Sequence, residues 1–221
     1  KSESDAVVRQ RAWEGYLSIA ARLPPQEQIK VSDGFDRPRE ESSQRFRLDL
    51  LKAVKTSTAT YEQLSRGERL SLMEKMSDAQ MKLTEHAAAA ASFEQAAGLV
   101  EDRGSPRAQN LYAQAVGALL LAHEDAAAVH RTKELIDGDP LNGEVKNPAV
   151  LTDAILQEIR NRAAAAGDAT GYAGVLTLAE FGAGLVGRAP PSFERELKTL
   201  KAEAIAKRAE MVDRLMATST E

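Results

Sequence analysis

Apolar residues recur at spacings of three and four along almost the whole chain, and this pattern constrains the fold more than any other feature of the sequence. Residues three and four apart lie on one face of an α-helix, so each run predicts an amphipathic helix. The alternation of apolar and polar residues that is typical of half-buried strands is nearly absent. We therefore predict an all-α protein, a multi-helix bundle or irregular helical array of about seven to nine helices, with no significant β-sheet.

The chain has 221 residues, which is enough to bury a hydrophobic core without a metal ion or a disulfide. We expect a single helical domain over 1–221. The alternative is a division near 141–148 into an N-terminal and a C-terminal helical part. Because the first residue is Lys1 rather than methionine, we expect the chain to be a processed or trimmed piece.

Proline, glycine and capping residues predict where the helices begin and end. Two consecutive prolines end the first helix at Pro24, and 26–41 is predicted to be a loop because it holds glycine, proline and several charges. Ser65 followed by Glu68 has the form of a capping box, which marks the start of a helix.

The helix that begins at this capping box is predicted to run for about 35 residues, because its apolar stripe ends clearly only at Gly104. Ser105 and Pro106 then provide an N-cap and a first helical residue for the next helix. That helix either bends at 123–125 or continues to Ile136.

A predicted helix over 169–187 contains Gly171, Gly174, Gly182 and Gly184. Glycine destabilises a helix interior, so its repeated use indicates a backbone pressed against a neighbour. The alternative is a helical enzyme or small-ligand binder with a pocket beside Gly171 and Gly174.

The last helix carries the clearest amphipathic pattern and is the main candidate surface for binding a partner. Its stripe consists of Phe193, Leu197, Leu200, Ala204, Met211 and Leu215. Three oppositely charged pairs one turn apart are expected to support it: Glu194 and Lys198, Glu203 and Lys207, and Glu210 and Arg214. The helix either completes its own bundle or pairs with a partner or a second copy, as in a coiled coil.

The densest basic stretch of the chain includes Arg37, Arg39 and Arg45. It is a second candidate surface, for an anionic partner. Acidic residues are interspersed with these arginines, so an ordinary solvated surface is the alternative interpretation.

Composition excludes several classes of function. The net charge of −4, with mixed signs throughout, lacks the concentrated basic face that nucleic-acid binding requires. The absence of cysteine excludes disulfides, thiol catalysis and cysteine-ligated metals. No apolar run reaches the length of a membrane span. We expect a soluble protein, either cytoplasmic or exported by a bacterium, whose partner is another protein and which binds no nucleic acid.

Motifs for catalysis and metal binding are absent as well. The chain has three histidines, and neither a metalloprotease motif nor the histidine pattern of di-iron bundles occurs around them. His123 and His130 are seven residues apart and are expected on one helix face, with Glu134 one turn further on, which is a solvated arrangement more than a metal site. Phosphate-binding loops and serine-hydrolase elbows are also missing. We predict no catalytic residue, no metal and no cofactor.

The segment 123–142, HEDAAAVHRTKELIDGDPLN, resembles the second helix and terminal Asp-Pro of a tetratricopeptide repeat. Pro106 and Pro140 stand 34 residues apart, which is the period of that family. Of the two equivalent positions for a small residue, Glu94 and Ala128, only the second holds one. The resemblance implies a concave peptide-binding surface.

These observations together predict a non-enzymatic helical module for protein-protein interaction, such as an adaptor, a component of a bacterial secretion or envelope machine, or a translocated effector. A tetratricopeptide-like scaffold and a helical enzyme or small-ligand binder are the alternatives.

Overall fold

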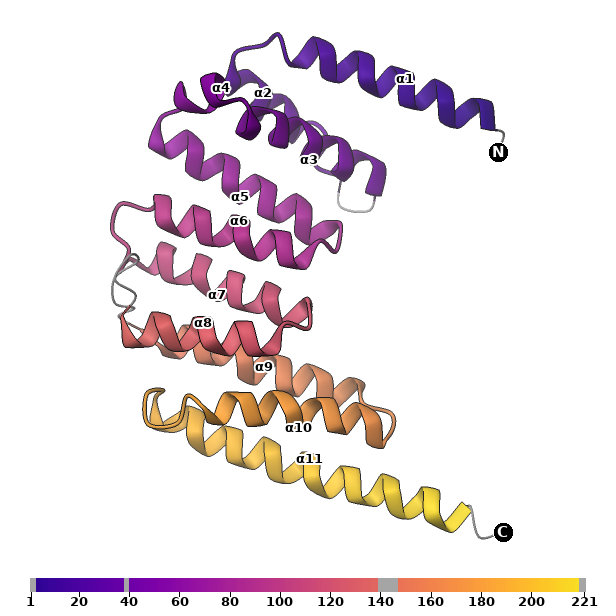
Figure 1. Ribbon diagram of the computed structural model, residues 1–221, viewed down its shortest axis with the longest axis vertical. Helices are drawn as coiled ribbons and strands as arrows, with labels where there is room; N and C mark the ends of the chain where they lie inside the picture. The colour runs from indigo at the N-terminus through magenta and orange to yellow at the C-terminus, as the bar shows by residue number, and fades with distance from the viewer. Residues whose placement is uncertain (1–2, 38–39, 139–146, 219–221) are drawn as a thin grey trace. The chain divides into compact units, whose positions relative to one another are not determined.

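A computed structural model describes residues 3–37, 40–138 and 147–218, apart from the side chains of 3–6 and 9–10. The described residues form eleven α-helices and no strand (Figure 1). The predicted all-α class is therefore confirmed, and the helix count exceeds the prediction. In this part of the chain, no helix is both long enough and apolar enough to cross a bilayer.

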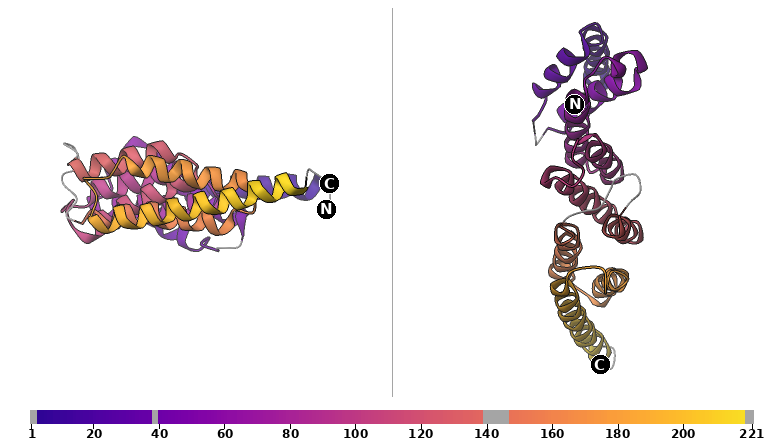
Figure 2. Two further views of the ribbon diagram at one scale, coloured as in Figure 1. Left: turned by 90° about the horizontal axis from the view of Figure 1, so that it is seen from below. Right: turned by 90° about the vertical axis from the view of Figure 1, so that its left-hand side faces the viewer.

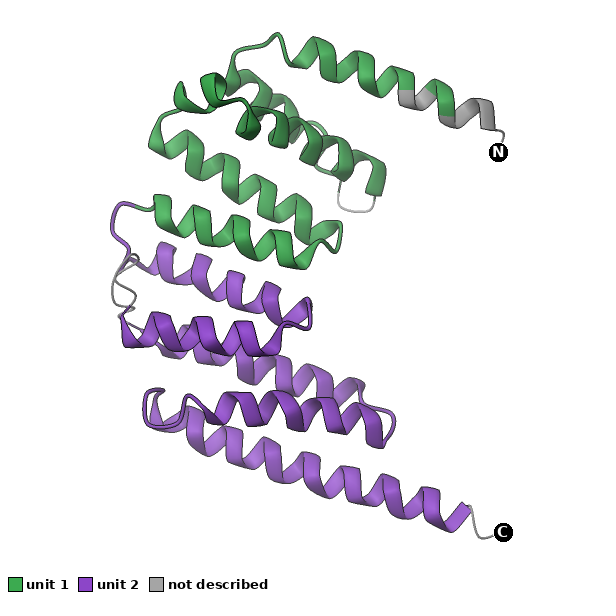
Figure 3. Cartoon of the chain, viewed as in Figure 1, with its two compact units in different colours: residues 1–100 green, residues 101–221 purple. Residues whose placement is uncertain are grey.

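The helices fall into two compact units, residues 1–100 and 101–221 (Figure 3). The helices of the first unit are α1 (Glu3–Ala20), α2 (Pro25–Asp33), α3 (Glu41–Thr56), α4 (Thr58–Glu62), α5 (Arg66–Lys82) and α6 (His86–Leu99). Those of the second are α7 (Pro106–Leu121), α8 (Asp125–Asp137), α9 (Ala149–Ala165), α10 (Ala169–Ala183) and α11 (Pro191–Thr218). The prediction of one domain over 1–221 stays a prediction, and so does a division near 141–148, of which 141–146 lie outside the described residues.

The first unit is built around α3 and α5, with α2 and α6 packed beside them. Leu48 and Leu51 of α3 and Leu72 and Met73 of α5 are completely buried. Helix α1 joins this core through an aromatic cluster, in which the ring of Trp13 stands edge-on to Phe46 at a centroid distance of 4.6 Å. Apolar burial and ring packing thus hold the unit together.

The predicted loop over 26–41 is wrong for its first half, which forms α2. Pro25 occupies the first turn of this helix, where the missing amide hydrogen breaks no helical bond. Ile29 is 6% exposed and Ser32 is completely buried. Nine residues are too few to show the apolar period clearly, which explains the error.

The long helix predicted from the capping box to Gly104 is in fact two helices. The capping box itself is confirmed: the Glu68 amide donates to Ser65 Oγ at 3.3 Å, and the Ser65 amide donates to Glu68 Oε2 at 2.7 Å. Helix α5 then ends at Lys82, with Leu83 as its C-cap, because Thr84 has a φ of 57°. A left-handed residue cannot continue an α-helix.

The same kind of turn joins α7 to α8, so the bend predicted at 123–125 is correct. His123 has a φ of 59°. Its amide donates to the oxygen of Leu120 at 3.0 Å, and the amide of Glu124 donates to the oxygen of Leu119 at 2.9 Å. These two bonds form a Schellman motif, with histidine in the position that glycine usually takes.

The hairpins α5–α6 and α7–α8 are therefore built alike, with equivalent residues 39 positions apart in the sequence. The equivalent pairs are Thr84 and His123, Glu85 and Glu124, and Ala89 and Ala128. Both glutamates stand at the N-cap of the second helix, and both alanines are completely buried. This spacing differs from the 34-residue period of tetratricopeptide repeats.

The second unit buries its apolar stripes between α7, α8, α9, α10 and α11. Ile155 and Ile159 of α9 and Leu178 of α10 are completely inaccessible to solvent. A partly buried ion pair joins two helices of this unit: Arg162 of α9 donates to both carboxylate oxygens of Asp125 of α8 at 2.7 Å. Helix α11 packs on α10 and so joins this core.

Candidate functional site

Helix α11 is the longest helix of the described residues, with 28 residues, and only its first half is packed into the second unit. Phe193, Leu197 and Ala204 are 2–3% exposed. After Ala204, every residue through Thr218 is exposed except Met211, which is half-buried. The second half of α11 extends past the turn that joins α9 to α10 (Figure 1 and the left view of Figure 2).

The exposed half of α11 carries large apolar side chains. Ile205 is 52% exposed, Val212 42% and Met216 67%. With Ala209, which is also exposed, these residues follow a spacing of four, three and four, so they lie along one face of the helix. We call this set the distal stripe: Ile205, Ala209, Val212 and Met216.

The same face is charged where α11 is still packed in its unit. Lys198 lies one heptad before Ile205, and Glu194 lies one turn earlier. Lys198 is 74% exposed at its side chain and pairs with Glu194 at 2.9 Å. The large apolar side chains of this face thus begin at Ile205, the residue that follows the last buried one.

The partner-binding residues expected from the sequence separate into two groups. Phe193 and Leu197 are buried, and Leu197 Cδ1 lies 3.4 Å from the position that a Cβ on Gly182 of α10 would occupy. They complete the unit's own core, which was one of the two predicted alternatives. Leu200 and Met211 are half-buried, and Leu215 is 59% exposed.

The spacing of apolar residues did not single out the distal stripe, because the neighbouring stripe that begins at Phe193 is more regular. A signal was present in the sequence: Ile205 and Val212 are seven residues apart, as are Ala209 and Met216. Such a heptad relation, starting where the same face had been charged, indicates a second apolar face.

The charge pairs of α11 also differ in part from the prediction. Glu194 pairs with Lys198 as expected. Lys207 pairs with Glu210 at 3.1 Å instead of with Glu203, and Arg214 makes no ion pair among the described residues. Arg208 and Asp213, on either side of the distal stripe, likewise make no ion pair with any described residue.

Two arginines of the basic stretch expected to bind an anion form ion pairs within the chain, and the anionic partner stays a prediction. Arg37 pairs with Glu40 at 3.2 Å, and Arg45 pairs with Glu85. Arg39 lies outside the described residues. The two placed arginines therefore serve ion pairs with carboxylates of the chain itself.

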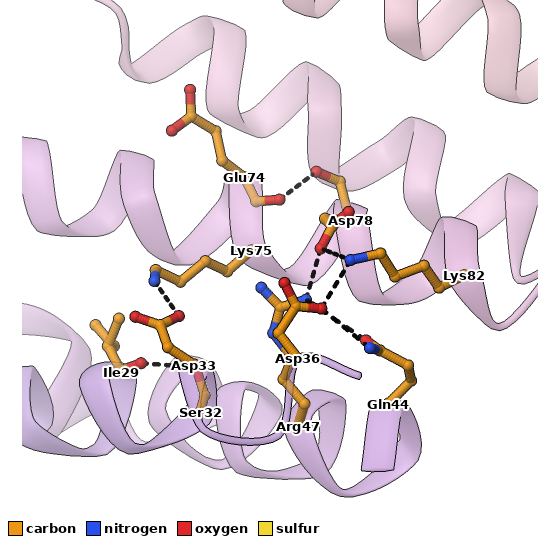
Figure 4. Close-up of polar contacts among 11 residues, drawn as sticks. Ile29, Ser32, Asp33, Asp36, Gln44, Arg47, Glu74, Lys75, Asp78 and Lys82 are labelled. Carbon is orange, nitrogen blue, oxygen red and sulfur yellow. Dashed lines mark hydrogen bonds and ion pairs between the residues drawn. The ribbon is translucent and has the colours of Figure 1, made fainter. Parts of the chain in front are cut away.

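A larger network of charges lies close by and joins α3 and the segment after α2 to α5 (Figure 4). Arg47, only 4% exposed, donates to Asp36 at 3.1 Å and to Asp78. Lys82 donates to the same two carboxylates, at 2.7 and 2.8 Å. Each charged side chain of the group contacts one of opposite charge. This arrangement is typical of ion pairs that connect neighbouring segments of a fold.

This network shifts the pKa values of two of its members. Partial burial alone would raise the pKa of Asp36, but the hydrogen bonds from Lys82 and Gln44 and the charge of Arg47 hold it below its ordinary value. Burial alone would lower the pKa of Lys82, and its bonds to Asp36 and Asp78 raise it above the ordinary value instead.

The glycine-bearing helix α10 is closely packed at some of its glycines and open at others. A Cβ on Gly171 would lie 3.0 Å from the Cβ of Ala166, whereas a Cβ on Gly174 would meet no atom within 4 Å. The ligand pocket considered beside these two glycines stays a prediction. An open pocket of about 630 Å³ lies at the start of α7, where Ser105, Gln109 and Asn110 line it.

The histidines do not form the arrangement expected from their spacing. His123 lies in the turn before α8, so it does not share a helix face with His130. His130 Nε2 lies 3.3 Å from Glu134, and the pair is exposed. Among the described residues, no group of three or more potential ligands is placed to hold a metal ion.

Helix α1 presents a further exposed apolar surface in the first unit. Val8 is 66% exposed and Ile19 65%, and both lie away from the aromatic cluster. The side chains at 3–6 and 9–10 of this helix lie outside the described residues.

No protein-family model, no curated protein and no solved structure matches the chain.

Proposed function

We propose that the protein is a non-enzymatic interaction module that binds another protein chain through the second half of α11. The observation that carries this proposal is the distal stripe. It lies in the part of α11 that no longer packs into the core of its unit. The exposed fractions there lie between 42% and 67% for Ile205, Val212 and Met216, which share one face of the helix. Apolar side chains in such a row favour contact with a second apolar surface.

The polar residues support the same proposal, because the charged clusters are used to hold helices together. Arg47 and Lys82 link three segments of the first unit, and Arg162 links α8 to α9 in the second. Catalytic groups are usually held with a perturbed pKa in a cleft and free to meet a substrate. Asp36 and Lys82, whose pKa values are both shifted, instead form an ion pair with each other at 2.7 Å.

The experiment that tests the proposal is site-specific photo-crosslinking in the cell from which the chain comes. A photoreactive phenylalanine derivative is placed at Val212 and, as the matched control, at Arg214, which is also exposed but lies on the opposite face of α11. We expect a protein adduct at position 212 and little or none at position 214.

Adducts with another protein and adducts between two copies of the chain both support the interaction module. Absence of any adduct at positions 205, 212 and 216, with the crosslinker incorporated and the chain folded, contradicts it.

A further inference from the structure

Resting on the proposed function, we infer that the occupant of the distal stripe is a second copy of the same chain, paired in parallel and in register as a short two-stranded coiled coil. The stripe supplies the required pattern. Ile205 and Val212 take the d positions of a heptad, and Ala209 and Met216 take the a positions. Layers of a and d residues alternate along the whole exposed half of α11.

The flanking charges select a second copy over an unrelated chain. In this register Arg208 occupies a g position and Asp213 the e position five residues later. A parallel pair brings each g residue next to the following e residue of the other helix. Arg208 of each copy would therefore face Asp213 of the other, and the symmetry of the pair makes this contact twice.

The two side chains are available for that contact. Both are exposed, and among the residues that the structure describes neither has an ion-pair partner. This separates them from Lys207 and Glu210, which pair with each other at 3.1 Å.

An antiparallel pair would place the same charges unfavourably. In that arrangement g faces g and e faces e, so Arg208 would approach Arg208 and Asp213 would approach Asp213. Like charges across such a contact oppose association. The distribution of charge thus favours the parallel orientation.

The polar stretch that precedes the stripe defines where the pairing begins. Lys198 takes the d position one heptad before Ile205, and a lysine there interrupts an apolar seam. Pairing is accordingly confined to about two heptads. A seam of that length buries less than a standard interface, so the dimer forms with a dissociation constant on the order of 100 µM.

Cysteine crosslinking tests the register, because the natural chain has no cysteine and gives no background. In a parallel pair the two copies of Ile205 face each other, so Ile205→Cys should form a disulfide-linked dimer under mild oxidation. Arg214→Cys, exposed on the opposite face, is the control and should remain largely monomeric. A mixture of Ile205→Cys and Met216→Cys chains that crosslinks mainly to each other indicates antiparallel pairing and overturns the inference.

Charge reversal tests the partner contacts in solution by sedimentation equilibrium. Arg208→Glu alone and Asp213→Lys alone should each weaken dimerisation, on the order of tenfold, and the double variant should restore it. Circular dichroism of each variant checks that the helix content is unchanged.

A mass that stays at the 23.9 kDa of one chain at every concentration, together with equal crosslinking at positions 205 and 214, overturns the second-copy inference. The proposed function survives that result if position 212 still forms an adduct with a different protein in the cell.

Discussion

The guanidinium of Arg162 in α9 meets both carboxylate oxygens of Asp125 in α8 at 2.7 Å, and the same group donates to the backbone oxygen of Leu120 at 2.8 Å. Asp125 is 13% exposed at its side chain and Arg162 16%. Removing the arginine would leave the carboxylate of Asp125 without this donor at a site with little access to solvent, whereas the Leu120 oxygen would keep its bond from the His123 amide. We expect Arg162→Ala to lower the free energy of unfolding by about 3 kcal/mol.

A neighbouring arginine on the same helix provides the control for this variant. Arg160 pairs with Glu196 of α11, but both side chains are about 40% exposed. An exposed pair contributes roughly 0–1 kcal/mol. Urea denaturation should therefore separate Arg162→Ala from Arg160→Ala, and equal losses would argue against a special role for the Asp125 contact.

The left-handed residue between α7 and α8 is predicted to limit stability. His123 has a φ of 59°, a conformation that strains any residue with a Cβ. His123→Gly should raise the free energy of unfolding by about 0.5–1 kcal/mol, as measured by thermal or urea denaturation. Ala126→Gly, at an exposed position inside α8, should do the opposite by about the same amount.

The network around Arg47 predicts sensitivity to acid. Because the pKa of Asp36 is lower in the folded chain than its ordinary value, its contribution to stability is present above that value and is lost as the pH falls below about 4. Asp36→Asn should therefore have a lower urea midpoint than the natural chain at pH 7, and the difference between the two midpoints should be smaller at pH 3. Asp153→Asn, which removes an exposed carboxylate, should follow the natural chain at both pH values.

Two glycines of α10 should respond in opposite directions to the same substitution. A Cβ at Gly171 would lie 3.1 Å from the Cα of Ala166, so Gly171→Ala requires a backbone shift and should destabilise the second unit by about 1–3 kcal/mol. A Cβ at Gly174 meets no atom, so Gly174→Ala should stabilise the helix by up to about 1 kcal/mol. Equal thermal midpoints for the two variants would contradict the packing described for α10.

Two changes in α11 should separate its structural half from its exposed half. A chain that ends at Ala204 keeps Phe193 and Leu197 in the core and should lose at most about 1 kcal/mol of stability, while losing the self-association inferred above. Leu197→Ala should lower the free energy of unfolding by about 2–5 kcal/mol and leave the distal stripe in place. A truncation before Phe193 would mix both effects, because it removes part of the core as well.

Local signals in the sequence predicted the structure well where a few adjacent residues decide the outcome. The capping box at Ser65 and the start of α7 at Ser105 and Pro106 are examples, since a cap depends only on residues within one turn. The end of α5 was missed for a related reason: Thr84 adopts a conformation for which glycine is the usual signal, and the apolar period resumes at once in α6.

The candidate site could be predicted only in part, because spacing does not distinguish an apolar face that is buried from one that is exposed. Phe193 and Leu215 belong to one regular stripe, yet the first is 2% exposed and the second 59%. What separates them is the length of α10 relative to α11, which depends on how the helices pack. Tertiary contacts of this kind are not encoded in any short stretch of residues.

The exposed half of α11, from Ile205 to Thr218, is fourteen residues long. A helix of that length is only marginally stable in water without a neighbour. Its backbone amides should thus exchange with deuterium far faster than those of α9, and they should become protected when a second surface covers them. The exchange rate of these amides would therefore show directly whether the exposed half of α11 is bound to a partner.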